Sequence, residues 1–214
     1  MSATKLVLAA QALGISNNYE LNSAWTKLSH SFASIAGPVH GIGFQANGRL
    51  DILLRQLEAE ALEIFALPAD KQPMLFIDQL SLFSEAWVIK TYEMVRAACQ
   101  QLRRKGETDE ALGALKHRLG LVRMPMAKAE IQMADRMKTP LMLGLGDGSE
   151  TKPYMADGSY IMPRTICGQT GSFCWVAVDI PSQRNVAISR RDLADELLAW
   201  VPVKTKVPYD SASA

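Results

Sequence analysis

Apolar side chains recur at three- and four-residue steps through the first two thirds of the chain, which is the repeat of one face of an α-helix. The segment 78–104 constrains the fold most. Its first half is apolar nearly all round, which is typical of a helix buried on several sides. We therefore expect it to be a central helix, whose apolar positions include Val88, Tyr92, Val95, Cys99 and Leu102.

Four further helices are predicted from the same repeat, over residues 18–36, 48–67, 108–119 and 125–138. Glycine or proline marks their ends, because neither residue continues a helix well. Residues 1–16 show no clear preference. The glycine-rich segment 37–48 reads as a flexible connection, with Asn47 as the N-cap of the helix that follows.

The predicted helix 48–67 has a leucine stripe, with charged residues placed off it. Asp51 and Arg55 are four residues apart, so we expect an ion pair on the helix surface. Glu58 and Glu63 also lie off the stripe. The Asp51–Arg55 pair should contribute only a few tenths of a kcal/mol.

The residue pattern changes near residue 140, where glycines and short apolar runs replace the helical repeat. Asp157-Gly158 is a hairpin signal, and Gly168–Gly171 predicts a second hairpin that joins strands near 160–167 and 172–180. The second of these strands is apolar on both faces, so we expect it to be central. A short strand near 186–188 and a helix capped by Ser189 follow.

The predicted fold class is α+β: an N-terminal bundle of about five α-helices, then a small antiparallel β-meander and a C-terminal helix. The helical region covers residues 1–140 and the β-containing region covers 141–214. The boundary separates either two domains or two parts of one core.

Composition weighs against some classes of protein. Lys and Arg total 23 against 22 Asp and Glu, whereas a protein that grips a nucleic-acid backbone needs a basic field. No run approaches the roughly 20 apolar residues that span a bilayer. Sparse cysteines are typical of a reducing compartment, so we expect a soluble, cytoplasmic protein with three free thiols, although Cys167 and Cys174 flank a turn where a disulfide is geometrically possible.

The candidate catalytic residues are His40 and Glu85, with His30 as a further member. Glu85 shares a helix face with apolar residues, and a carboxylate buried there needs a cationic partner. The histidines could converge with Glu85 on an acid/base or metal site at the junction of the two regions. No spacing typical of a zinc site occurs, so we predict no metal and no cofactor. Cys167 has no histidine near it in sequence, which weighs against a catalytic thiol.

Two other features could bind ligands. Glycine-rich segments at 37–48 and 144–148 could present backbone N–H groups to an anion, although neither has a strand–loop–helix context. The stretch 103–128 could form a basic face for nucleic acid; its cations are Arg103, Arg104, Lys105, Lys116, Arg118, Arg123 and Lys128.

Three functional hypotheses remain. The first is a non-enzymatic binding or regulatory protein, in which the helical region self-associates as a homodimer or larger homo-oligomer and the β region recognises a ligand. The second is a small-molecule enzyme or metal-dependent hydrolase that uses His40 and Glu85. The third is nucleic-acid binding through residues 103–128, which the near-neutral charge disfavours.

Overall fold

The computed structural model describes residues 2–73, 75–144 and 150–201. Helices occupy most of the chain up to Lys128, and strands follow. The long helices are α1 (Ala3–Asn17), α2 (Tyr19–Ala36), α3 (Pro38–Phe65), α4 (Phe76–Arg104), α5 (Glu110–Lys128) and α6 (Arg190–Ala199), and two 3-10 turns are η1 (Ala69–Lys71) and η2 (Ala134–Arg136). The strands are β1 (Met142–Gly144), β2 (Thr151–Pro153), β3 (Arg164–Ile166), β4 (Phe173–Asp179) and β5 (Arg184–Ser189).

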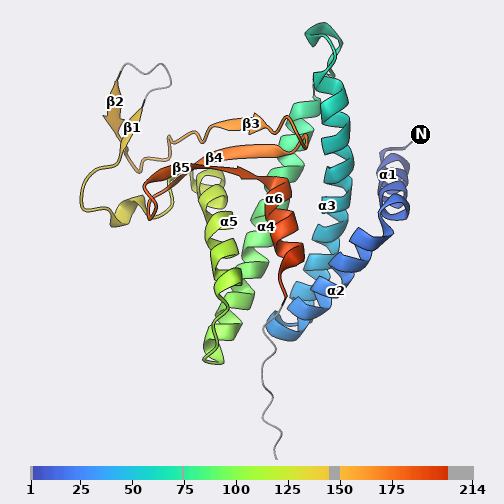
Figure 1. Ribbon diagram of the computed structural model, residues 1–214, viewed down its shortest axis with the longest axis horizontal. Coiled ribbons are helices and arrows are strands. Elements are labelled where there is room, and N and C mark those ends of the chain that lie inside the picture. The colour runs from blue at the N-terminus through green and yellow to red at the C-terminus, as the bar shows by residue number, and fades with distance from the viewer. Residues whose placement is uncertain (1, 74, 145–149, 202–214) are drawn as a thin grey trace, which may run out of the picture.

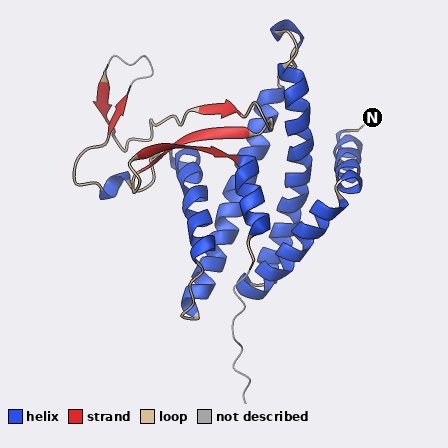
Figure 2. Cartoon of the chain, viewed as in Figure 1, coloured by secondary structure: helices blue, strands red, loops and turns tan. Residues whose placement is uncertain are grey.

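The α+β prediction is confirmed: a helical body carries a small antiparallel sheet across one end (Figures 1 and 2). Helices α3, α4 and α5 stand side by side, and α6 descends from the sheet along them (Figure 1). Helix α1 stands on the outer side of α3. The central position expected for residues 78–104 agrees with α4, which contacts α2, α3, α5 and β4.

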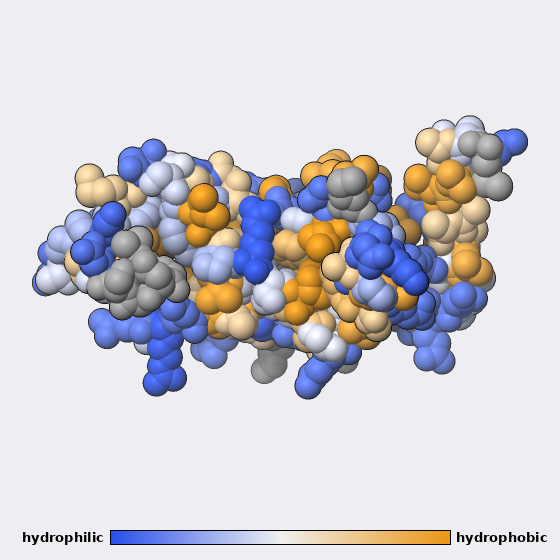
Figure 3. Space-filling model, turned by 90° about the horizontal axis from the view of Figure 1, so that it is seen from above, coloured by the Kyte–Doolittle hydropathy of each residue, from blue (hydrophilic) through white to orange (hydrophobic). Residues whose placement is uncertain are grey.

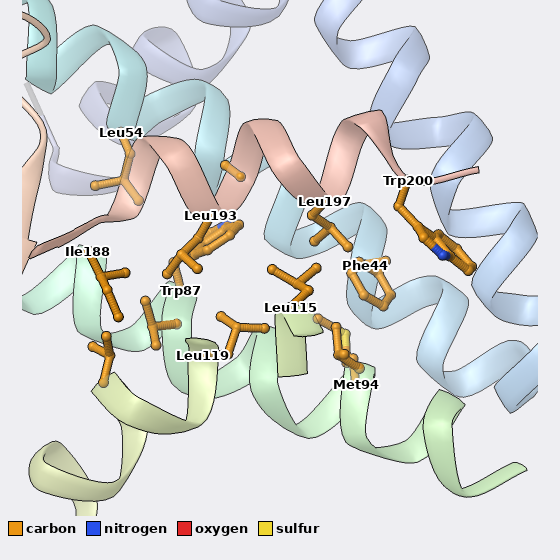
Figure 4. Close-up of a cluster of buried hydrophobic side chains, with 14 of the residues drawn as sticks. Phe44, Leu54, Trp87, Met94, Leu115, Leu119, Ile188, Leu193, Leu197 and Trp200 are labelled. Atoms are coloured by element: carbon orange, nitrogen blue, oxygen red, sulfur yellow. The ribbon is translucent and has the colours of Figure 1, made fainter. Parts of the chain in front are cut away.

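A single cluster of buried apolar side chains draws on both the helices and the sheet (Figure 4). Trp87 of α4, Leu119 of α5 and Ile188 of β5 belong to this cluster together with Leu193 and Leu197 of α6. Complete burial of a leucine side chain contributes roughly 1.5–3 kcal/mol. The apolar face of α6 therefore fixes the sheet to the helical body.

The sheet has the order β3–β4–β5, with antiparallel pairing throughout. The inner face of β4 puts Phe173, Trp175 and Ala177 into the core, while Val176 and Val178 are half-buried on its outer face. The second predicted hairpin and the central place of its long strand are confirmed. A separate two-stranded ladder joins β1 to β2, with Leu143 opposite Lys152.

The prediction of a flexible loop over 37–48 was wrong, because α3 begins at Pro38. A Cβ atom on Gly41 would lie 2.6 Å from the Cβ of Ala33, and one on Gly48 would lie 2.5 Å from the Trp25 ring. These glycines allow α2 and α3 to pack closely, which offsets their cost of about 1 kcal/mol each in a helix. Asn47 is consequently a buried helical residue, not an N-cap.

Other local predictions also need correction. Residues 3–17 form α1, and no helix covers 125–138, since α5 continues through Pro125 and ends at Lys128. Asp157-Gly158 forms a turn without flanking strands, in which the Asp157 carboxylate accepts a hydrogen bond from the Ser159 N–H (3.0 Å). Gly144 ends β1, and the rest of the predicted glycine loop 144–148 lies outside the described residues.

Candidate functional site

The structure places His40 and Glu85 in different parts of the helical body. The side-chain amide of Asn47 on α3 donates to the Thr91 hydroxyl of α4 over 2.6 Å. These two residues therefore lie at the same level along the axes of the two antiparallel helices. His40 lies seven residues away from that level in one direction, and Glu85 lies six residues away in the other. At 1.5 Å per helical residue, about 20 Å separates them along the helix axes.

The two histidines lie at the same end of the α2–α3 pair, because Gly41 packs against the backbone of Ser29. His30 is exposed and His40 is half-buried. The third histidine, His117, lies on α5 with its Nε2 atom 3.0 Å from Asp179 Oδ1. Within the described ranges, no three His, Cys, Asp or Glu side chains are grouped closely enough to hold a metal ion.

Glu85 has the cationic partner that its sequence context requires. Its Oε1 atom lies 2.8 Å from Arg164 Nη1 on β3, and the Ser81 hydroxyl donates to the same oxygen over 3.4 Å. Both side chains of the pair remain partly in solvent. The arrangement ties α4 to the edge strand β3.

The basic stretch 103–128 is partly neutralised by acidic neighbours. Arg118 pairs with Glu196 of α6, and Arg123 pairs with Glu93 of α4 over 3.3 Å. Arg123 also lies over the Tyr92 ring, 5.3 Å from its centre. These cations therefore stabilise helix contacts as well as presenting charge.

A network of buried charged side chains lies between α3 and α6. Asp51, Glu58 and Arg190 are all fully buried. Arg190 pairs with both carboxylates, and its Nε donates to Glu58 Oε1 over 2.9 Å. The Trp25 indole N–H donates to Asp51 Oδ2 over 2.9 Å.

Further charges surround that centre. Arg55 Nε lies 2.9 Å from Asp51 Oδ2, and its Nη2 pairs with Asp195 of α6. Arg191 donates from Nε to Glu58 Oε2 over 2.7 Å. Burial tends to lower the pKa of Arg55, but its two carboxylate partners prevail and raise that pKa above its ordinary value. Three guanidinium groups thus meet three carboxylates, so the network carries no net charge.

Local sequence explains how this network forms. Asp51, Arg55 and Glu58 follow helical four- and three-residue steps, so they share one face of α3. The Ser189 hydroxyl caps α6 by accepting from the N–H groups of Arg191 and Asp192. Arg190 is then the first helical residue and projects back toward α3.

The expected Asp51–Arg55 pair exists, but Asp51 and Glu58 are fully buried, which the spacing of charges on α3 did not predict. The available signal was the run of acidic, basic and acidic residues at helical spacing. The missing information was the partner Arg190, 132 residues beyond Glu58. Removing one member of such a network would leave the opposite charges buried without compensation.

Helix α1 presents the opposite arrangement. Leu6, Leu8 and Leu13 are 54%, 58% and 58% exposed, and Lys5 is the single charged residue between Ala3 and Asn17. Seen from the sheet end, α1 projects from the side of the molecule with hydrophobic residues on its surface (Figure 3). Gly14 is the one residue of α1 that is buried, and it packs against Ile52 and Gln56 of α3.

A cavity of about 420 Å³ lies on the outer face of the sheet. Tyr154, Tyr160, Ile161 and Val176 contribute apolar walls, and Lys152 adds a charge. The tyrosine rings meet edge to face, with centres 6.2 Å apart. Burial raises the pKa of Tyr160, and the neighbouring Tyr154 adds to the effect.

A second cavity of about 320 Å³ shares Leu143, Gly144, Val178 and Asn185 with the first. The two cavities therefore flank β1 above the end of β4. Small-molecule sites in proteins have volumes of about 300–1,000 Å³ and mostly apolar walls with a few polar groups. The two cavities have volumes within this range, and polar and apolar side chains both line them.

Comparison of the chain with family models, with characterised proteins and with solved structures gives no match. Among the described helices, none is both long enough and apolar enough to cross a bilayer.

Proposed function

We propose that the protein is a non-enzymatic binding or regulatory protein of the cytoplasm that self-associates through α1. The exposed apolar surface of α1 is the observation that carries the proposal. The β region would supply the recognition surface, through the cavities that flank β1. The separation of His40 from Glu85 favours binding over acid/base catalysis.

The chemistry of α1 supports a second copy of the chain as its partner. Leu6, Val7 and Leu8 are consecutive, so they point to three sides of the helix. A helix that is apolar all round is stable when several neighbours cover it. Removing apolar surface from water contributes about 25 cal/mol per Å², and pairing two α1 helices would cover one apolar side of each in a single contact.

The attachment of α1 also suits an interface. The Gln56 amide of α3 can donate to the Ala10 carbonyl (3.2 Å) and accept from the Gly14 N–H (3.0 Å). This contact holds the second half of α1, while the first half extends away from α3. Two such extensions can pair without displacing any core residue.

Light scattering after size exclusion, over a range of protein concentrations, tests the proposal. The unaltered chain should elute as a dimer or larger oligomer, and the double variant Leu6→Glu/Leu13→Glu should elute as a monomer. Its circular dichroism should remain that of the folded protein, because both side chains are more than half exposed.

Leu82→Glu on α4 is the matched control, since Leu82 is 63% exposed and belongs to another surface. This variant should retain the oligomer. A monomeric unaltered chain at all concentrations, or an oligomer that survives both changes in α1, would overturn self-association through this helix.

A further inference from the structure

Two of the three cysteines lie at the closed end of the β3–β4 hairpin. Thr165 of β3 is opposite Cys174 of β4, and Cys167 is two residues beyond Thr165. Side chains two residues apart project from the same face of a strand. Cys167 and Cys174 are therefore diagonal neighbours on one face of the hairpin.

Both cysteines donate a hydrogen bond to the same carbonyl oxygen. The Cys167 N–H donates to the Ser172 carbonyl over 2.8 Å, and the Cys174 thiol donates to that same oxygen over 3.5 Å. The Gly171 N–H closes the turn on the Cys167 carbonyl over 2.8 Å. The Cys174 thiol is thus held beside the backbone of Cys167.

The two thiols differ in environment. The Thr170 hydroxyl lowers the pKa of Cys167, and backbone N–H groups of Gln169 and Thr170 lower it further. Cys167 is partly exposed, so its sulfur can meet a dissolved oxidant. Burial raises the pKa of Cys174 to about 11, with a further contribution from Cys167. One thiol is therefore accessible and the other is a protected neighbour.

We propose that Cys167 is a redox-reactive modification site and that Cys174 resolves its oxidised form into an intramolecular disulfide. The oxidant class is a peroxide. This assignment is independent of self-association, because it concerns the hairpin and not α1.

The reaction balances in two steps. The Cys167 thiolate attacks one oxygen of hydrogen peroxide and the O–O bond breaks, which gives a sulfenic acid on Cys167. The other peroxide oxygen is protonated and leaves as water. The Cys174 sulfur then attacks the sulfenic sulfur, the S–O bond breaks, and a second water leaves with the proton of Cys174. Two thiols are oxidised to one disulfide, and one peroxide is reduced to two waters.

Geometry permits the bond with a small movement. Diagonal residues in an antiparallel pair have Cα atoms about 7–8 Å apart, and disulfides join Cα atoms up to about 6.8 Å apart. The hairpin would close by about 1 Å. Strand β3 has three residues and lies at the edge of the sheet, so it can move without breaking the ladder between β4 and β5.

The hairpin touches the charge network, which gives oxidation a route to the helical body. Gly171 packs against the Glu58 carbonyl of α3, and the Ser172 hydroxyl accepts from the Arg191 N–H of α6. Cys174 is opposite Ser189, the cap of α6. Closing the hairpin would therefore change contacts at the junction of α3, β4 and α6.

The full chain should be treated with a small excess of hydrogen peroxide, and its free thiols should then be blocked with N-ethylmaleimide. Its intact mass should be measured by mass spectrometry before and after reduction. We expect the three free thiols to fall to one, so that the chain carries one maleimide adduct in place of three, and we expect Cys167 to be joined to Cys174 in the peptide map. After the adduct mass is subtracted, the oxidised chain should be two hydrogens lighter than the untreated chain. Cys174→Ser should instead stop at a sulfenic acid on Cys167 that dimedone traps. Cys99→Ser should form the same disulfide as the unaltered chain.

A second measurement separates reactivity from folding. Thr170→Val should slow alkylation of Cys167 by iodoacetamide near neutral pH by about threefold to tenfold and move its pH profile upward, because the thiolate fraction changes about tenfold per pKa unit. Thr170→Ser keeps a hydroxyl and should retain most of the rate. Three unreacted thiols after peroxide, oxidation at Cys99 alone, or an unshifted profile in Thr170→Val would overturn the proposal.

Discussion

The junction of α3 and α6 buries charged side chains, whereas α1 exposes apolar ones. Arg190, Asp51 and Glu58 are fully buried, yet Leu6 and Leu8 are more than half exposed. Residue type alone predicts the reverse for both regions. Each guanidinium and carboxylate of the junction has partners within the chain, and the outer half of α1 has few. Burial in this molecule follows the availability of a partner.

The largest expected effect comes from breaking the network at its centre. Arg190→Met leaves two buried carboxylates without their main cation, so the free energy of unfolding should fall by about 3–5 kcal/mol. Urea unfolding followed by tryptophan fluorescence measures this loss. Arg191→Met is the control, because Arg191 is partly exposed and shares Glu58 with Arg190. An equal or smaller loss in Arg190→Met would contradict the central role of Arg190.

A smaller loss is expected where the hairpin meets α3. A Cβ atom on Gly171 would lie 1.8 Å from the Glu58 carbonyl oxygen, and its φ of +68° favours glycine. Gly171→Ala should therefore lower the free energy of unfolding by about 2–4 kcal/mol, from overpacking together with backbone strain. Gly168→Ala in the same turn has open space around its Cβ and should cost far less. Equal losses in thermal melts of the two variants would contradict close packing at Gly171.

An ion pair at the surface sharpens the contrast with the buried network. Glu85→Gln removes the charge that faces Arg164 on β3. Because both side chains reach solvent, the free energy of unfolding should fall by less than about 1 kcal/mol, and added salt should shrink the difference. A loss comparable to that of Arg190→Met in urea unfolding would show that this pair is not a surface interaction.

The smallest effect belongs to α1. Leu8→Gln should change the free energy of unfolding by no more than about 0.5 kcal/mol in dilute solution, where copies of the chain are separate. At high concentration it should lower the melting temperature relative to the unaltered chain, because self-association stabilises the folded state by mass action. A dilute-solution loss of about 2–5 kcal/mol, as for a core leucine, would mean that α1 is already packed within one chain.

Sequence patterns correctly predicted those helices and strands whose position is determined by local periodicity. The apolar repeat located α4, the continuous apolar run at residues 172–180 located β4, and Ser189 marked the start of α6. Helix α3 was predicted to begin about ten residues too late, because the glycines that disfavour a helix locally are those that admit the Trp25 ring and Ala33. Tertiary contact outweighed propensity there.

The candidate sites depended on distant partners, which periodicity does not reveal. Glu85 was predicted to need a cation, and that cation is Arg164 from β3. The burial of Asp51 and Glu58 was not predicted, because their partner Arg190 is remote in sequence. His40 and Glu85 share no local spacing that would have set their distance. The cysteine pair was visible as two thiols around a turn, but its asymmetry depends on burial and on Thr170.

The order of residues along the chain gives the charge network a consequence during synthesis. Glu58 leaves the ribosome 132 residues before Arg190, an interval on the order of ten seconds at typical translation rates. Throughout that interval, the acidic face of α3 can pack against Trp25 and α4 only with its main countercharge missing. The buried charge network between the helices is therefore completed late, after the first turn of α6 has been synthesised.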